Sequence, residues 1–161
     1  MKRHPSLAVL SRDHHLGLVL VQRLQGKAAT ADSDWPQNRD AQRDRTLQFF
    51  DREMEPHFRA EEQFLFPLAG RFAPAAANFV ALLLKQHGQI RALAGQLRGA
   101  KEVQLANLLL RFAHVLEEHI RKEERSFFEH FQKEVPEDRL IESGRQIEEY
   151  LRETREVPGS V

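Results

Sequence analysis

The segments HFRAEEQFLF (residues 57–66) and HIRKEERSFF (residues 119–128) decide the predicted fold, because they are two copies of one pattern. The histidine, the arginine, both glutamates and the last phenylalanine coincide. Upstream of each copy, a second repeat appears when His14 is aligned with His87, because several leucines and a glycine then fall at matching positions. The chain is therefore predicted to form two helical hairpins. Each hairpin has one histidine on its first helix and a His-x-x-x-Glu motif on its second.

Apolar residues at three- and four-residue steps predict that most of the chain is helical. The expected long helices span residues 5–26, 39–68, 74–97 and 101–133. Pro56 lies inside the second of them, and its missing backbone donor predicts a kink or bulge there. Four long helices with short connections predict an all-α bundle over residues 1–135. We expect a short amphipathic helix and tail, residues 136–161, to pack on the same domain.

The His-x-x-x-Glu spacing predicts a metal site, because residues four apart in an α-helix differ by only about 40° and share one face. Two such helices that face each other can build a dinuclear centre, in which both glutamates bridge and the histidines cap each metal in pairs. The chain has no cysteine, so the ligands are imidazole and carboxylate, which suit Fe, Mn or Zn. The predicted metal ligands are His14, His57, Glu61, His87, His119 and Glu123.

Neighbours of these residues offer alternative ligands. Helix phase places His14 in the middle of the apolar stripe of the first helix, whereas His15 points towards a polar side. The alignment with His87 also selects His14. Glu62 and Glu124 are predicted to face solvent or to support the ligands from outside. Direct coordination by Glu62, Glu124 or His15 stays open.

Charge and hydropathy exclude several classes of partner. The 24 basic residues balance the 24 acidic ones, so no net field attracts nucleic acid or an acidic membrane. The N-terminal segment lacks the uninterrupted apolar stretch of a secretory signal. No segment approaches the roughly 20 apolar residues that span a bilayer. We therefore expect a cytoplasmic protein without nucleic-acid or membrane partners, of open oligomeric state.

Four short segments together resemble the hemerythrin-like HHE cation-binding domain. They are residues 10–15, 56–62, 85–87 and 118–124, and the likeness covers about residues 5–133. The resemblance implies an up-down-up-down four-helix bundle that holds two iron ions in an oxo- or hydroxo-bridged centre, with Zn or Mn as possible substitutes. It also implies reversible O2 binding, as in some members, or sensing of iron, oxygen, nitric oxide or redox state, as in others.

Two positions depart from the oxygen-carrying members of that family. Those proteins place a further histidine one turn after the ligand of the third helix, where this chain has Arg91. A guanidinium has no acceptor and cannot bind a metal ion, so the resemblance implies an open position instead of stable O2 carriage. Those proteins also tend to place the last carboxylate five residues after its histidine, which corresponds to Glu124.

Three functions are compatible with these features. We expect a non-enzymatic module that binds or senses iron, O2, NO or another small oxidant such as peroxide. The first alternative is an enzyme, namely a di-iron oxidase or peroxidase or one that repairs nitrosative damage, because an unsaturated metal can act as a redox or Lewis-acid centre. The second is a zinc-bound or metal-free helical interaction scaffold. Repeated consumption of O2 or peroxide distinguishes the enzyme, and metal analysis distinguishes the scaffold.

Overall fold

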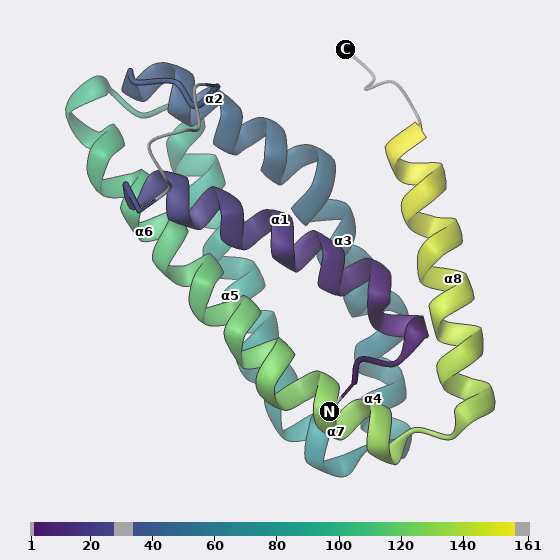
Figure 1. Cartoon of the computed structure of the whole chain (residues 1–161). Coiled ribbons are helices and arrows are strands. Elements are labelled where there is room, and N and C mark those ends of the chain that lie inside the picture. Colours follow the sequence, from purple (N-terminus) through teal and green to yellow (C-terminus); the bar gives the residue numbers. More distant parts are fainter. Residues whose placement is uncertain (1, 28–33, 157–161) are drawn as a thin grey trace.

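The computed structural model describes residues 2–27 and 34–156, and these form five helical rods without a strand (Figure 1). The first rod is η1 (Pro5–Leu7) and α1 (Ala8–Leu24), and the second is α2 (Arg39–Phe49), η2 (Phe50–Met54), α3 (Glu55–Ala60), η3 (Glu61–Leu65) and α4 (Phe66–Phe72). The others are α5 (Pro74–Arg98), then α6 (Glu102–Lys122) with η4 (Glu123–Phe127) and α7 (Phe128–Glu134), and finally α8 (Glu137–Glu156). The all-α prediction is confirmed. Part of the predicted loop, 28–33, and the predicted tail, 157–161, lie outside the described residues.

The second rod passes two prolines by widening into π-helical turns. Glu55 donates its N–H to Phe50 O, five residues back, immediately before Pro56. Phe66 donates in the same way to Glu61 O before Pro67. The bulge predicted at Pro56 is therefore confirmed. The predicted end at residue 68 was too early, because the π turn lets the rod continue past Pro67 to Phe72.

Local signals set the ends of the first two rods. Gly26 ends the first rod with a φ of 68°, a left-handed conformation that glycine adopts without steric cost. Asn38 caps α2, because its side chain accepts a hydrogen bond from the backbone N–H of Ala41 at 2.7 Å. The connection between these two helices thus begins and ends at residues whose chemistry suits those positions.

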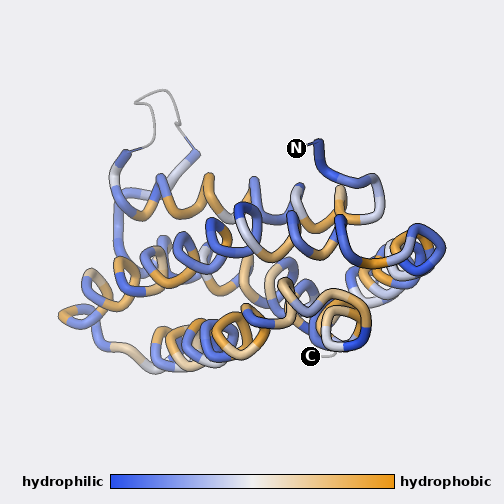
Figure 2. Tube along the Cα trace, turned by 90° about the horizontal axis from the view of Figure 1, so that it is seen from below, coloured by the Kyte–Doolittle hydropathy of each residue, from blue (hydrophilic) through white to orange (hydrophobic). Residues whose placement is uncertain are grey.

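The core consists of two apolar clusters with a polar layer between them. In α1, Leu10 belongs to one cluster and Leu20 to the other. In α5, Leu83 and Ile90 are divided in the same way. The histidines His14 and His87 fall between these leucine and isoleucine positions along their helices. Figure 2 shows the apolar and polar residues alternating along each helix with the period that buries one face.

Helix α8 packs along the outside of the bundle (Figure 1). Its close contact with η1 occurs at Gly144, where an added Cβ would lie 2.6 Å from Ser6 Cβ and 2.7 Å from Ser6 Cα. Ser6 Cα is backbone and cannot rotate away. At the other end of α8, Arg155 reaches back to Asp13 of α1 at 2.7 Å. The last helix is therefore attached to the first rod at both ends.

Gly144→Ala is expected to lower the free energy of unfolding by about 1–3 kcal/mol, because the methyl group would overpack the contact with Ser6. The control is Gly95→Ala in α5, where no described atom outside the helix's own backbone lies within 4 Å. That change is expected to raise stability by up to about 1 kcal/mol through helix propensity. Chemical denaturation of both variants measures the two signs, and equal effects would contradict the close approach of α8.

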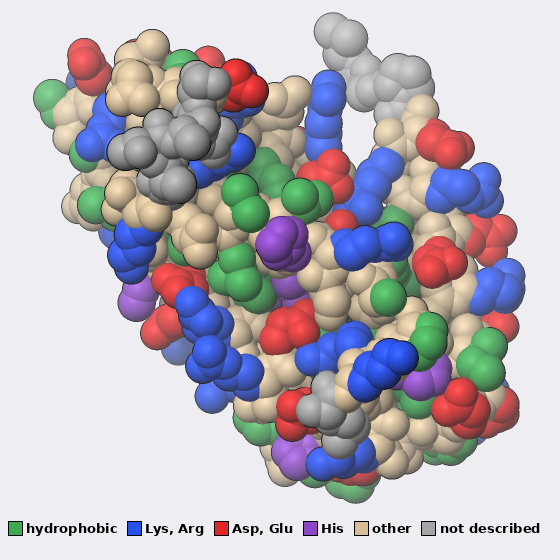
Figure 3. Space-filling model, viewed as in Figure 1, with side chains coloured by type: hydrophobic (Ala, Val, Ile, Leu, Met, Phe, Trp, Pro, Cys, Tyr) green, Lys and Arg blue, Asp and Glu red, His purple; other side chains and the backbone are tan. Residues whose placement is uncertain are grey.

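The surface carries both signs of charge. Figure 3 shows Lys and Arg interspersed with Asp and Glu over the visible face. Such mixing differs from the continuous basic stripe with which proteins bind nucleic-acid phosphates. Of the helices in the described ranges, none has the length and apolar character required to cross a membrane.

Candidate metal centre

The structure brings together all six predicted ligands between the rods. They come from α1 (His14), α3 (His57), the first residue of η3 (Glu61), α5 (His87), α6 (His119) and the first residue of η4 (Glu123). His14 is 1 % exposed and the others are fully buried. They form two groups that share one carboxylate, and the donor atoms within each group lie within 4.8 Å of one another. We call them the His14 group (His14, His57, Glu61, Glu123) and the His87 group (Glu61, His87, His119).

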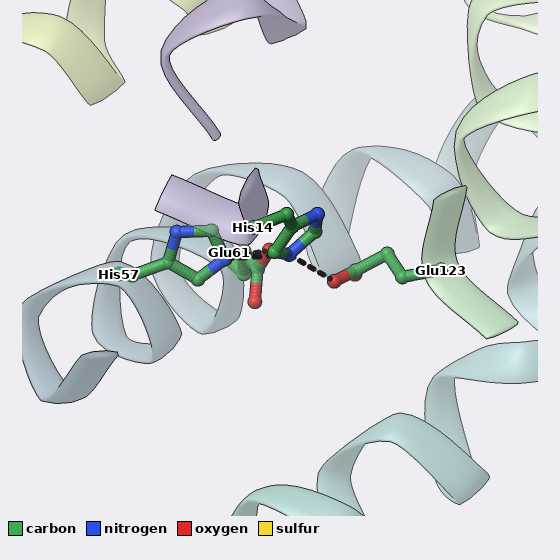
Figure 4. A group of neighbouring side chains, drawn as sticks. All are labelled: His14, His57, Glu61 and Glu123. Carbon is green, nitrogen blue, oxygen red and sulfur yellow. Dashed lines mark hydrogen bonds and ion pairs between the residues drawn. The ribbon is translucent and has the colours of Figure 1, made fainter. Parts of the chain in front are cut away.

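The His14 group has four donors that converge from three rods (Figure 4). His57 Nε2 lies 2.8 Å from Glu61 Oε1, as the four-residue spacing predicts. His14 Nε2 lies 3.1 Å from His57 Nε2 and 3.3 Å from Glu123 Oε2. The Nε2 atoms of His14 and His57 and the carboxylate oxygens of Glu61 and Glu123 thus converge on one point.

The His87 group lies on the other side of Glu61. His87 Nε2 is 3.3 Å from Glu61 Oε2, whereas the Oε1 atom of the same carboxylate faces the His14 group. His119 Nε2 is 3.5 Å from Glu123 Oε2. Each oxygen of Glu61 thus faces a different pair of histidines, which is the arrangement that a bridging carboxylate requires.

Unsatisfied polar atoms show that these residues fit bound cations. Among the described residues, both oxygens of Glu61 and Glu123, Nε2 of His87 and both ring nitrogens of His119 are buried without a hydrogen bond. The short distances from these two carboxylates to the imidazoles therefore join atoms whose geometry does not suit hydrogen bonding. Buried polar groups without partners cost about 1–3 kcal/mol each. A metal ion in each group would supply these polar atoms with the partners that they lack among the described residues.

Both bridging candidates stand at the start of a π-helical segment. Glu61 opens η3 and Glu123 opens η4, so the repeat seen in the sequence is also a repeat of backbone geometry. A proline follows η3, but no proline lies in or directly after η4. π-helical turns inside α-helices occur frequently at functional sites. Sequence reasoning did not predict the turn at Glu123, because its local residues carry no signal for it.

Carboxylates hold the outer nitrogens of three of the histidines. We call such a side chain, bonded to Nδ1, an outer partner. His14 Nδ1 lies 2.8 Å from Glu124 Oε1, and His87 Nδ1 lies 2.8 Å from Glu62 Oε1. Glu62 and Glu124 thus support the histidines and are absent from both groups, and His15 is exposed.

Asp13 is the outer partner that sequence reasoning missed. Its Oδ2 accepts from His57 Nδ1 at 3.0 Å, and Arg155 of α8 donates to the same oxygen at 2.7 Å. Burial opposes ionisation of Asp13, but the bonds with His57 and Arg155 outweigh it and lower the pKa. Asp13 directly precedes the predicted ligand His14, and this position was the signal in the sequence that could have identified it.

The two buried glutamates of the centre, Glu61 and Glu123, differ in their affinity for a proton. Burial and the nearby charge of Glu123 raise the pKa of Glu61 to about 8. Burial also disfavours ionised Glu123, but the adjacent imidazole of His14 and the other neighbouring histidines lower its pKa to about 2. Two buried carboxylates at one site resist ionising together, and a divalent cation removes that repulsion.

Comparison with known proteins identifies the family of this arrangement. The model of the hemerythrin HHE cation-binding domain matches residues 6–131, a range that contains all six donors. The chain belongs to the hemerythrin HHE family. No curated protein and no solved structure matches this hemerythrin HHE chain. Its family and its buried His and Glu groups both indicate metal binding.

The histidines of this hemerythrin HHE chain have contrasting environments. Burial lowers the pKa of His119 well below its usual value, which favours the neutral form that can bind a metal. At His87, burial acts in the same direction, but the adjacent carboxylate of Glu61 and the hydrogen-bonded carboxylate of Glu62 outweigh it and raise the pKa. A metal ion at the His87 group would therefore displace a proton from His87.

Arg91 lies one helical turn beyond His87 and is held away from both groups. Its Nε donates to Glu55 at 2.7 Å, and its Nη1 donates to Glu62 at 2.8 Å. Arg91 therefore fixes the outer partner of His87. The His87 group has three donors against four in the His14 group.

Proposed function

We propose that this protein is a non-haem di-iron protein, an up-down-up-down bundle that binds or senses iron, O2, NO or another small oxidant. His14 and His57 would hold one iron, His87 and His119 the other, and Glu61 and Glu123 would bridge the two. Imidazole and carboxylate without thiolate suit iron, with Zn or Mn as possible substitutes. When bound, iron supplies redox chemistry and coordination positions for a small ligand.

One observation carries this proposal, namely the division of a buried donor cluster into two groups that share Glu61. A site for a single ion would not need a carboxylate that faces two pairs of histidines from opposite oxygens. In helical bundles, carboxylates and histidines from facing helices bind two metals in this manner. The arrangement therefore favours a dinuclear centre over a mononuclear one.

The arginine at position 91, where oxygen carriers have a histidine, supports binding of a small ligand. The guanidinium of Arg91 cannot bind a metal ion, so a metal held by His87 and His119 would have one protein ligand fewer than in the oxygen-carrying members of the family. Phe58 stacks on the ring of His87 with centroids 3.9 Å apart, and Phe66 stacks on it at 5.6 Å. These buried rings orient His87 and exclude water from its surroundings.

The test is elemental analysis and a visible spectrum of full-length protein purified from iron-supplied cells. Two irons per chain and an oxo-bridge absorption in the near ultraviolet are expected. Zinc at stoichiometric amounts and no iron, reproduced after iron supplementation, would contradict a di-iron centre and favour the zinc-bound scaffold.

A di-iron oxidase, peroxidase or repair enzyme is the second candidate, favoured by the same missing imidazole at Arg91. The reduced protein would then consume O2 or peroxide over many turnovers. A binding or sensing protein would consume at most the amount equivalent to its iron. Oxygen-electrode measurements with a chemical reductant distinguish the two.

A further inference from the structure

Three of the four histidines have a carboxylate outer partner, and two of these bonds correspond to each other under the internal repeat. The repeat pairs His14 with His87 and Glu124 with Glu62, and the bonds His14–Glu124 and His87–Glu62 are both 2.8 Å long. It also pairs His57 with His119. Because Asp13 stands directly before His14, its equivalent is the residue directly before His87, which is Gln86.

Gln86 is buried and, within the described residues, has an unpaired acceptor, as expected of a residue equivalent to Asp13. It is 7 % exposed, and in the part of the chain that the structure describes its Oε1 has no hydrogen-bond partner. His119 Nδ1 is likewise buried without a partner there. Gln86 lines a surface cavity of about 440 Å³ together with Glu118 and Lys122, which flank His119 on α6. Gln86 and the turn of α6 that carries the unpartnered histidine thus line one cavity.

An arginine supports each carboxylate outer partner. Arg3 bonds Glu124 at 2.7 Å, Arg91 bonds Glu62 at 2.8 Å and Arg155 bonds Asp13 at 2.7 Å. An amide oxygen can accept from imidazole as a carboxylate does, but it carries no charge and makes the imidazole a weaker metal ligand. The His14 group therefore has two anionic outer partners, whereas the His87 group has one.

We infer that Gln86 becomes the outer partner of His119 when metal is bound, because its Oε1, unpaired among the described residues, can then accept from His119 Nδ1. Gln86 is thus a positioning residue whose neutral amide makes the His87 group the weaker of two unequal metal sites. This inference rests on the proposed dinuclear function and adds an order of binding to it. The metal at the His14 group is retained, and the metal at the His87 group is exchangeable. Loss of an outer partner typically changes metal affinity by about 10–100-fold.

The test is iron release from the full-length Fe(II)-loaded protein, measured anaerobically with a chelator that forms a coloured Fe(II) complex. In wild type, one iron per chain is expected to leave at chelator concentrations about ten-fold or more below those needed for the other. Gln86→Glu should strengthen retention of the weak iron about ten-fold, and Gln86→Leu should weaken it about ten-fold. Neither change should alter release of the strong iron.

Two further variants complete the design. Gln96→Glu makes the same charge change at an exposed position of α5 and should behave as wild type. Asp13→Asn gives His57 a neutral partner and should weaken the strong iron instead. Arg121, Lys122 and Arg125 line the cavity beside Gln86, so a carboxylate at residue 86 is compatible with the fold.

The outcomes separate the two proposals. If Gln86→Glu and Gln86→Leu both release two irons as wild type does, or shift both irons equally, the role of Gln86 is overturned while the di-iron proposal stands. A wild-type protein that binds no iron would overturn the proposed function, and the inference with it.

Discussion

Glu61→Ala is expected to lose both irons, so that the metal content falls from about two per chain to near zero. Glu61 is the carboxylate shared by the two groups, and each of its oxygens faces a different histidine pair. Glu123→Ala should have a similar effect, because Glu123 Oε2 lies near both His14 and His119. Elemental analysis of the purified variants measures the loss. The control is Glu118→Ala, which removes an exposed carboxylate beside His119.

Stability should change in the opposite direction from metal binding. Without metal, the carboxylate of Glu61 is buried and lacks hydrogen bonds within the described structure, so it destabilises the fold. Because the pKa of Glu61 is raised to about 8, folding at neutral pH requires this carboxylate to take up a proton, which costs stability. Glu61→Gln keeps the shape and needs no proton, so it is expected to stabilise the metal-free protein by about 1–3 kcal/mol while still abolishing tight iron binding. Denaturation in the presence of a chelator measures this.

Full metal content in Glu123→Ala, together with its loss in Glu124→Ala, would instead identify the five-residue spacing between histidine and carboxylate as the functional one.

His14→Ala is expected to empty one metal position, leaving about one iron per chain, whereas His15→Ala should retain two. The two residues are adjacent in sequence and chemically identical, so the pair isolates the effect of orientation. His14 is 1 % exposed and directs Nε2 into the His14 group, and His15 lies at the surface. Metal analysis and the near-ultraviolet spectrum of both variants test the difference.

His14→Ala also removes the hydrogen bond to Glu124. That carboxylate keeps bonds from Arg3 at 2.7 Å and Ser11 at 2.7 Å, so the surrounding structure should persist. Thermal unfolding in chelator is therefore expected to be similar for His14→Ala and wild type. The opposite pattern of metal content, with loss in His15→Ala alone, would require α1 to be rotated by about 100° about its axis.

The sequence by itself determined the helical class and the residues that meet between the rods. Both follow from periodicity, because a four-residue step places His57 and Glu61 on one face in any α-helix. Helix phase likewise distinguished His14 from His15. Pro56 predicted a bulge, since a missing backbone donor disturbs a helix wherever it occurs. Each of these inferences depends on interactions within one helix.

The tertiary structure decided which side chains from different rods bond to each other. Glu124 supports His14 rather than His119, which lies five residues before it, and Arg155 of α8 reaches Asp13 of α1. Such pairs join residues far apart in the chain, and their geometry depends on how the rods pack, which no local spacing encodes. The same reason explains why the sequence left Glu62 and Glu124 as possible ligands. Only the packed rods place these carboxylates at Nδ1 of the histidines, outside both metal groups.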